Sequence, residues 1–511
     1  MASHEIGPFP AELLSAKKEI RERARAYGLD FFPVIYEMCD YEQMNQLAAY
    51  GGFPQRYPHW RFGSEYEGLR KRHHYGLGRI YEMVINNDPC YAYLQESNAL
   101  VDQKLVIAHV YGHSDFFKNN FWFSKTNRKM MDEMANHATR VRKHIEKQGY
   151  DTVERFLDVC LSLEDLIDPH SMFLNRGPME RAKEEPTAAE EAPRKFKAKD
   201  YMDRYINPAG VLEAESKKRK KEADRVRHAT PARATRDVLL YLLQHGRLDD
   251  WQADCLSIVR EESYYFAPQG MTKVMNEGWA SYWHSTLMTK HFANASEIID
   301  YADHHSGTVH MPPGGFNPYK IGIEIFRDIE DRWNKGKFGK EYEESTNLGE
   351  KKSWDKGLGL GREKIFEVRK VYNDVNFIDE FLTPEFIEKH KFYQYGRDPH
   401  TGQLRVLSRD PQRIKHSLLY HLTNLGRPFI YVADGNYCNR GELYLAHQHN
   451  GQDIEIKFAV ETLKNVHKIW KRPVHLQARI DDDMILISFS GDQPKQQTIH
   501  DDFPKPAHQV L

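Results

Sequence analysis

Apolar positions recur at helical spacing along two long stretches of this chain. From residue 11 to about 173, and again from about 229 to about 395, they return every three or four residues, as in helices with one buried face. Between these stretches, residues 176–228 combine dense charge, proline and alanine with few apolar positions, so they cannot bury enough surface to fold alone. The pattern predicts two helical regions, 1–175 and 229–395, that pack as one domain, with a charged linker or insertion between them.

The pattern changes in the last hundred or so residues. Helical spacing at 411–426 is followed by two segments of alternating apolar and polar residues, a helical segment at 455–470, and two more alternating segments. This order predicts a small α+β domain over 400–495 with the succession αββαββ. The polar end of the chain, 496–511, is predicted to be a disordered tail. The predicted fold class is mainly α, with a small C-terminal α+β domain.

The composition narrows the function classes. The 511 residues carry a formal net charge of −2, so no overall field favours nucleic acid or a membrane surface. The five cysteines are scattered singly, which is typical of reduced thiols and argues against a cysteine-bound metal. The start of the chain has no basic segment followed by an apolar one, and no stretch approaches the roughly 20 apolar residues that span a bilayer. We therefore expect a soluble, cytoplasmic protein.

Two histidines of the first helical region point to metal chemistry. In the segment IAHVYGHSDFFKNN, His109 and His113 are four positions apart, which places both imidazoles on one face of a helix. Zinc peptidases with this spacing carry a glutamate, the general base, directly after the first histidine. Here that position is Val110. The pair is therefore either a metal-binding helix without its usual base or two histidines that happen to share a face.

A carboxylate in the second helical region completes a candidate site. Glu277 lies in the segment KVMNEGWASYWHSTLM, where a buried charge is costly unless it is paired or bound to metal. His284 lies seven positions further on, on the same helix face. The letters NEGWA resemble the helix that supplies the glutamate ligand in the gluzincin branch of the zinc peptidases. The resemblance implies a zincin-like helical core with one Zn²⁺ ion, or another divalent metal, held by His109, His113 and Glu277.

Other side chains are candidates for the missing base. Glu96 ends a predicted strand, CYAYLQESN, that runs into the histidine helix, with Ser97 or Asn98 as the predicted N-cap. Its carboxylate is a candidate general base, although an exposed charge at a helix start explains it equally well. His305 is the next candidate, as an acid or a transition-state stabiliser.

Three further residues are candidates for supporting roles. Asp102, seven positions before His109, is a candidate acceptor for an imidazole N–H of the site. His284 and His59, the latter in the aromatic segment YPHW, are candidates for an additional ligand or a proton donor. Any one of these histidines is more commonly structural.

Five longer motifs resemble those of the SpoVR family, stage V sporulation protein R. They are GGFPQRYPHWRFGSEYE, YEMVINNDPCYAYL, DQKLVIAHVYGHSDFFKNN, VMNEGWASYWH and NPYKIGIEIFRDIEDRWNKG. The resemblance covers about residues 10–490. It implies a link to formation of the spore cortex, a peptidoglycan layer, and to the stress response in bacteria and archaea that form no spores. It also implies, as partners, a PrkA-type serine kinase and a von Willebrand-type protein.

Three functions remain open on this basis. The first is a metal-dependent hydrolase that cuts an amide bond in a peptide or a peptidoglycan precursor. The second is a metal-stabilised regulatory protein without catalysis, which the absence of a base at Val110 favours. The third is a metal-free adaptor whose C-terminal domain docks the kinase complex.

Overall fold

The chain forms two compact units, each built from two separate segments. Unit 1 comprises Met1–Lys147 and Tyr265–Gly426, and unit 2 comprises Gln148–Tyr264 and Arg427–Leu511. The computed structural model describes residues 9–74, 82–174, 202–217, 230–398, 401–500 and 504–510. Among these residues, no helix has the length and apolar character needed to cross a bilayer.

Unit 1 contains a small mixed sheet with the strand order β1-β3-β2. Strand β1 runs parallel to β3, whereas β2 pairs with β3 in the antiparallel sense and forms one edge. The first residue of this edge strand is Glu82. The central strand β3 is buried along almost its whole length, since both of its edges are paired. The strands are Val34–Cys39 for β1, Glu82–Ile85 for β2 and Cys90–Gln95 for β3.

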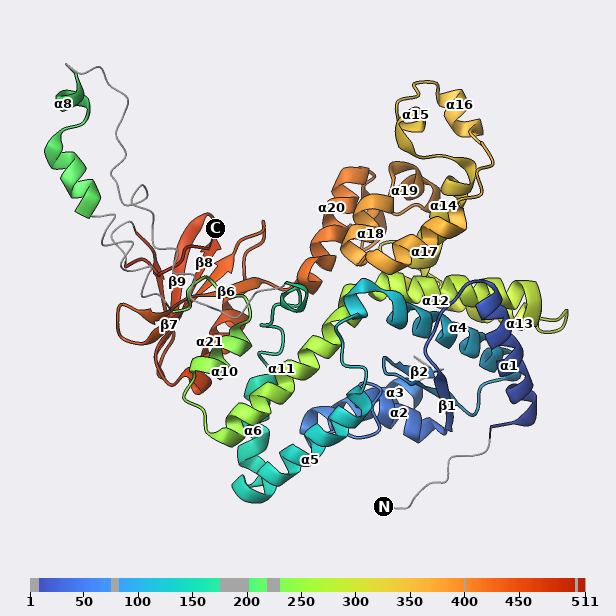
Figure 1. Cartoon of the computed structure of the whole chain (residues 1–511), viewed down its shortest axis with the longest axis horizontal. Coiled ribbons are helices and arrows are strands. Elements are labelled where there is room, and N and C mark those ends of the chain that lie inside the picture. The colour runs from blue at the N-terminus through green and yellow to red at the C-terminus, as the bar shows by residue number, and fades with distance from the viewer. Residues whose placement is uncertain are drawn as a thin grey trace. The chain divides into compact units, whose positions relative to one another are not determined.

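Two helices at the centre of unit 1 carry the candidate ligands. Helix α4, Leu100–Asn119, and helix α12, Lys273–Leu287, pack against each other along their length (Figure 1). Most residues of both helices are buried, including polar ones, as expected of helices enclosed in a core. On another face, α12 packs against α14, Pro318–Lys335.

Glycines allow these three helices to approach closely. A Cβ atom on Gly112 of α4 would lie 2.7 Å from the Cα atom of Ala280 on α12. A Cβ atom on Gly278 of α12 would lie 2.4 Å from the Cα atom of Gly322 on α14. Both separations are far below van der Waals contact, so the glycines set the distances between the helix axes.

The start of α12 is held by a carboxylate from a distant part of the chain. Asp374 accepts hydrogen bonds from the backbone N–H groups of Val274, at 2.8 Å, and Met275, at 2.9 Å. These are two of the donors that a helix leaves unpaired at its N-terminus, and Thr272, the residue that precedes the helix, makes no side-chain cap. Asp374 itself is 2 % exposed. It therefore takes the place of a local N-cap.

Replacing Asp374 by alanine should destabilise unit 1. The variant leaves two buried N–H groups without an acceptor, which we expect to lower the free energy of unfolding by about 2–4 kcal/mol. Chemical denaturation followed by circular dichroism measures the change. The control is Asp379→Ala, on the same short helix but with a side chain that is 64 % exposed. Equal losses in the two variants would contradict the capping role.

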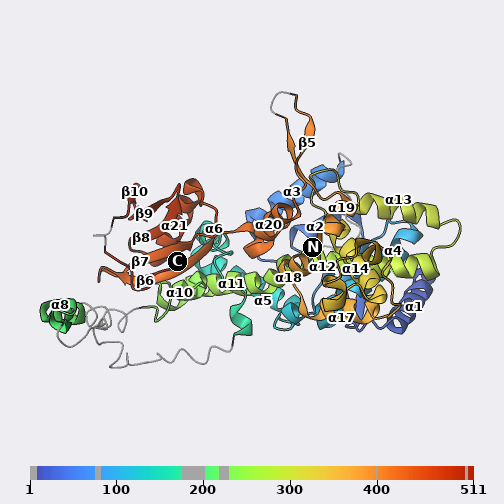
Figure 2. The same ribbon diagram turned by 90° about the horizontal axis from the view of Figure 1, so that it is seen from above.

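The other helices of unit 1 surround this centre, and a two-stranded ribbon, β4–β5, projects from them (Figure 2). The largest hydrophobic core among the described residues lies here and joins α1, α4, α12, α14, α17 and α18. The elements are α1 Ala11–Ala26, α2 Tyr41–Ala49, α3 Trp60–His74, α5 Met130–Gln148, α13 Ile298–Thr308, α15 Gly339–Glu343, α16 Leu348–Ser353, α17 Gly361–Val371, α18 Asp374–Phe381, α19 Pro384–His390, α20 Pro411–Leu422, β4 Gln394–Arg397 and β5 Leu404–Ser408.

Unit 2 is an α+β unit around a five-stranded sheet with the order β10-β9-β8-β7-β6. The central pair β7 and β8 is parallel and is joined by helix α21, whereas the other pairs are antiparallel. The elements are β6 Phe429–Tyr437, β7 Glu442–Gln448, α21 Ile456–Trp470, β8 Val474–Ile480, β9 Asp483–Phe489, β10 Lys495–Thr498, α6 Tyr150–Leu161, α8 Asp203–Ile206 and α10 Val238–His245. Helix α11, Asp250–Met271, contains the boundary between the units.

The mainly helical fold class and the small C-terminal α+β part agree with the sequence prediction, but the boundaries differ. The predicted helix at 411–426 belongs to unit 1, because α20 packs against α18. Conversely, α6 and α10 belong to unit 2, not to the predicted large helical domain. Most of the linker predicted at 176–228 lies outside the described residues; inside it, residues 203–206 and 209–217 are helical.

Within the tail predicted to be disordered, 496–511, the structure describes residues 496–500 and 504–510. Strand β10 pairs with β9, and the backbone N–H of Ala507 donates to the Asp434 carboxylate at 2.9 Å. The carbonyl oxygen of Pro504 accepts a hydrogen bond from the Tyr437 hydroxyl. In the described part of this segment, residues 496–498 therefore extend the sheet, and Pro504 and Ala507 hydrogen-bond to it.

Candidate metal centre

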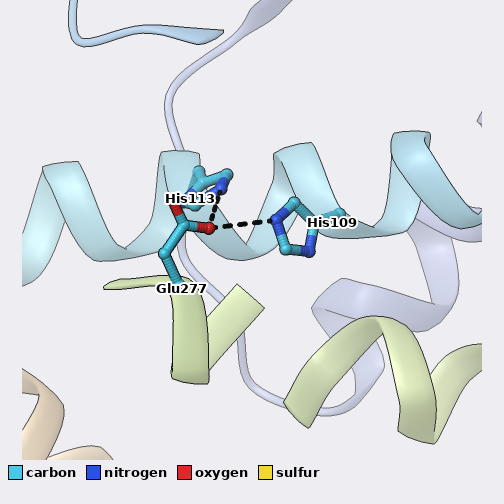
Figure 3. A group of neighbouring side chains, drawn as sticks. All are labelled: His109, His113 and Glu277. Carbon is cyan, nitrogen blue, oxygen red and sulfur yellow. Dashed lines mark ion pairs between the residues drawn. The ribbon is translucent and has the colours of Figure 1, made fainter. Parts of the chain in front are cut away.

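The two histidines and the glutamate predicted from the sequence converge in unit 1. Glu277 Oε2 lies 3.5 Å from His109 Nε2 and 3.5 Å from His113 Nε2 (Figure 3). One ligand atom from each of the three residues lies within 4.8 Å of the others. Helix α4 supplies both imidazoles and α12 the carboxylate, so the close packing of these helices creates the group.

The arrangement around His113 leaves an electron pair facing a carboxylate. His113 Nδ1 lies 2.8 Å from Asn276 Oδ1, which can only accept, so the ring hydrogen lies on Nδ1. Burial, with a smaller effect of His109, lowers the pKa of His113 to about 4, so the imidazole is neutral near pH 7. Its Nε2 therefore carries a lone pair that points toward Glu277 Oε2, an atom with no hydrogen-bond partner of its own.

A cation held between these atoms would remove the repulsion between them. Two electron-rich atoms at 3.5 Å repel each other, and a buried carboxylate oxygen without a partner is costly. Ligand atoms about 2.1 Å from a tetrahedral zinc ion lie roughly 3.4 Å apart, which agrees with the two separations from Glu277. Two neutral imidazoles and a carboxylate are also an established ligand set for zinc. The residues therefore fit a divalent ion.

His284, on α12, fixes the orientation of the His109 ring. The Nδ1 atoms of His109 and His284 are 2.9 Å apart, and His284 Nε2 lies 3.1 Å from His305 Nδ1. Burial, reinforced by His109, lowers the pKa of His284 well below its ordinary value, so its neutral ring donates at one nitrogen and accepts at the other. A hydrogen bond at Nδ1 leaves Nε2 of His109 directed toward Glu277. His284 and His305 thus lie behind His109 and not in the ligand group.

Two residues that the sequence did not single out line the site. Glu82, the first residue of the edge strand β2, has Oε1 4.0 Å from His109 Nε2. Burial, together with the nearby charge of Glu277, raises the pKa of Glu82. The ring of Tyr319, from α14, stacks on His109 with ring centroids 6.2 Å apart. Burial, with the charges of Glu277 and Glu82, raises the pKa of the Tyr319 phenol, so it keeps its proton.

The open side of the site is the side of the carboxylates. The side chains of Glu277 and Glu82 are 17 % and 20 % exposed, whereas that of His109 is 4 % exposed. The sequence predicted that Trp279, Tyr111 and Phe116 or their neighbours line a cleft at the site; all three lie in the closed hydrophobic core. These three aromatic side chains pack between the helices, so the exposed side of the site is formed by polar residues.

The other predicted residues lie elsewhere. Asp102 was predicted to accept from an imidazole of the site; it contacts His304 Nδ1 on α13, and the partner of His109 Nδ1 is His284. His59 is buried just before α3, where its Nδ1 accepts from the Arg61 N–H at 3.2 Å. Neither residue belongs to the ligand group.

Glu96 is exposed in the turn after β3, and its backbone N–H donates to the Cys39 carbonyl. The predicted caps also differ, because Ala99 precedes α4 and makes no side-chain cap. The central strand β3 ends before Glu96 and is paired along both of its edges. The carboxylate that lies near His109 comes instead from Glu82 on the edge strand β2. The candidate base on this side of the sheet is therefore Glu82.

Removing a bound ion should destabilise the wild type specifically. Without a cation, the lone pair of His113 and the Glu277 carboxylate are left facing each other. We expect a chelator to lower the melting temperature by about 5 °C or more. The same treatment should leave the double variant His109→Ala/His113→Ala unchanged. Differential scanning calorimetry measures both, and equal shifts would argue against a bound ion.

Comparisons with known proteins cover nearly the whole chain. Residues 9–427 match the family model described as "SpoVR like protein", and residues 428–481 match "SpoVR-like C-terminal domain". The two matches meet near Gly426, where unit 1 ends. A protein of Escherichia coli (strain K12), described as "Uncharacterized protein YcgB", is 30% identical over 499 residues, which cover 91% of this chain and 92% of that protein. No solved structure matches significantly.

Proposed function

The chain belongs to the SpoVR family, and we propose that it is a metal-dependent hydrolase of an amide bond in a peptide or a peptidoglycan precursor. The observation that carries the proposal is the meeting of His113 Nε2 with Glu277 Oε2, two electron-rich atoms at 3.5 Å without a hydrogen between them. The ligands of the proposed divalent ion, zinc in the first instance, are His109, His113 and Glu277.

The chemistry of the site is divided between the ion and the protein. A bound zinc ion supplies Lewis acidity, which polarises a carbonyl and makes water more acidic. Glu82 accepts the proton of the attacking water, a role that suits a carboxylate whose pKa is raised by burial. The Tyr319 phenol, which stays protonated, donates to the oxygen on which negative charge develops. His284 holds His109 in position from behind.

The proposed substrate class follows from the site and the family together. A neutral carbonyl next to two carboxylates suits an amide better than a phosphate ester, because the phosphate charge would be repelled by Glu82. The link of the SpoVR family to the spore cortex, a peptidoglycan layer, supports a peptide or a precursor of that polymer as the molecule cut.

Mass spectrometry of candidate substrates tests this proposal. The zinc-loaded protein is incubated with synthetic peptides, including stem peptides of peptidoglycan precursors. We expect cleavage with uptake of one water, abolished by a chelator and in the His109→Ala/His113→Ala variant. Absence of cleavage in a broad peptide set, or cleavage that persists in the double variant, would contradict the hydrolase.

The second candidate is a metal-stabilised regulatory or adaptor protein without catalysis, acting with a PrkA-type kinase system. Val110 favours this candidate, because it occupies the position at which zinc peptidases with this motif carry their general base. The Val110 side chain is 0 % exposed and lies in the hydrophobic core. This candidate keeps the ion and the chelator effect but has no role for Glu82. The two candidates therefore differ in catalysis and not in metal binding.

A further inference from the structure

Unit 2 contains a pocket that has no part in the metal centre. Its volume is about 320 Å³, within the range of pockets that hold small molecules. It lies among helix α10, the turn between β6 and β7, and the segment that leads from α21 into β8. The lining residues are Thr230, Tyr241, His245, Arg247, Gly435, Asn436, Gly441, Trp470 and Arg472.

Among the residues that the structure describes, the lining is basic and contains no carboxylate. Arg247 and Arg472 both face the pocket, and among the described residues neither guanidinium lies within ion-pair distance of an acidic side chain. The nearby carboxylate of Glu442 is already paired, with Arg440 at 2.7 Å and His475 at 2.9 Å. Two uncompensated guanidinium groups at one cavity create a local positive potential that favours an anion.

The backbone of the pocket is shaped to hold one arginine in place. A Cβ atom on Gly441 would lie 1.7 Å from Arg472 Nη1, so this glycine leaves the space that the guanidinium occupies. The residue also has a φ of +68°, which glycine adopts without strain. The Trp470 indole donates to the Gly441 carbonyl at 3.0 Å and fixes the turn beneath. Arg472 is therefore positioned by packing and not by a salt bridge.

We propose that this pocket binds the phosphate group of a small phosphorylated molecule of nucleotide size. Guanidinium groups match the geometry of phosphate oxygens through paired N–H donors. The Asn436 amide and the imidazole of His245 add polar groups beside the arginines. A phosphate alone would fill only part of the cavity, and Tyr241 and Trp470 give the rest of the wall an aromatic character suited to an organic group.

Isothermal titration calorimetry on the full-length protein tests the proposal. The probes are adenosine 5′-monophosphate and inorganic phosphate, with adenosine as the uncharged control. A chelator in the buffer prevents phosphate from binding to a metal at His109. We expect adenosine monophosphate to bind at least as tightly as inorganic phosphate, and adenosine to show no binding.

Three variants assign the binding to the pocket. Arg247→Gln and Arg472→Gln should each weaken binding of adenosine monophosphate at least about tenfold, because each removes a charge-assisted contact. Arg247→Lys, which keeps the charge but loses the fork and lies at an exposed position, should weaken it less. The control is Arg479→Gln on β8, whose guanidinium pairs with Asp482 outside the pocket. Circular dichroism verifies that each variant is folded.

Several results would overturn the proposal. They are the absence of saturable binding to the wild type, binding of adenosine as tight as that of its monophosphate, and unchanged affinity in a folded Arg247→Gln protein. Weaker binding of the monophosphate than of free phosphate would also overturn it, since the pocket would then hold only an inorganic anion. None of these results depends on the metal centre, because the ligands there are kept metal-free.

Discussion

The Gly112→Ala variant is expected to lose its metal although every ligand is still present. The added Cβ would lie 2.7 Å from the Cα atom of Ala280, a backbone position that cannot rotate away. Relief of this clash moves α4 away from α12, and Glu277 then no longer reaches the two imidazoles. We expect metal affinity to fall at least about 100-fold, because ligand geometry tolerates errors of only a few tenths of an ångström. The free energy of unfolding should fall by about 1–3 kcal/mol.

A matched control separates the clash from the loss of a glycine. Gly68 lies in helix α3, and a Cβ atom there would meet nothing within 4 Å. Gly68→Ala should bind metal normally and be slightly more stable, since alanine favours helices by up to about 1 kcal/mol over glycine. Metal content after dialysis and chemical denaturation measure both variants. A Gly112→Ala protein with a full complement of metal would show that the spacing of the helices does not set the site.

The Glu82→Gln variant is expected to keep its metal and lose most of its hydrolytic rate. Glutamine preserves the size of the side chain but cannot accept the proton of the attacking water. We expect kcat to fall on the order of 10²–10⁴-fold, the usual contribution of a general base. Metal content should stay at the wild-type level, since Glu82 Oε1 lies 4.0 Å from His109 Nε2 and Glu82 is not one of the three ligands.

Glu96→Gln is the control for this variant, since Glu96 is an exposed carboxylate in the turn after β3. It should hydrolyse the substrate at the wild-type rate. If Glu96→Gln were slow and Glu82→Gln were normal, the assignment of the base would be reversed. If both were normal in an active protein, the proton would be accepted by another group of the site.

The meeting of His109, His113 and Glu277 could be predicted from the sequence because its signals are local. The spacing of His109 and His113 places both on one helix face, and a glutamate in an aromatic helix requires a partner. The C-terminal strands were predicted for a similar reason, since their alternation of apolar and polar residues gives the two faces of a sheet. In each of these cases the pattern lies within one element.

The features that the sequence did not predict depend on contacts between distant elements. Glu82 begins a four-residue strand, and only the pairing of β2 with β3 brings it to His109. The roles of Gly112 and Gly278 likewise depend on helix crossings that no local pattern encodes. Glycine in a helix interior is unfavourable by itself. The presence of Gly112 in the HVYGH segment and of Gly278 in the NEGWA segment is therefore a signal that could have indicated close helix contacts.

The domain boundaries could not be predicted because each unit joins segments far apart in the chain. Helix α11 reads as one continuous amphipathic element, yet the boundary between the units falls between Tyr264 and Tyr265. The capping of α12 by Asp374, about a hundred positions further along the chain, is hidden in the same way. Local patterns predicted the elements, whereas the pairing of distant segments decided where they belong.

Anomalous X-ray diffraction at the zinc absorption edge tests the metal centre most directly. Crystals of the zinc-loaded, full-length protein should show an anomalous peak about 2.0–2.2 Å from His109 Nε2, His113 Nε2 and a carboxylate oxygen of Glu277. The peak should be absent from crystals of the His109→Ala/His113→Ala variant grown with the same zinc. A wild-type map with no peak among these three residues, in crystals that contain zinc, would contradict the metal centre and the hydrolase proposed from it.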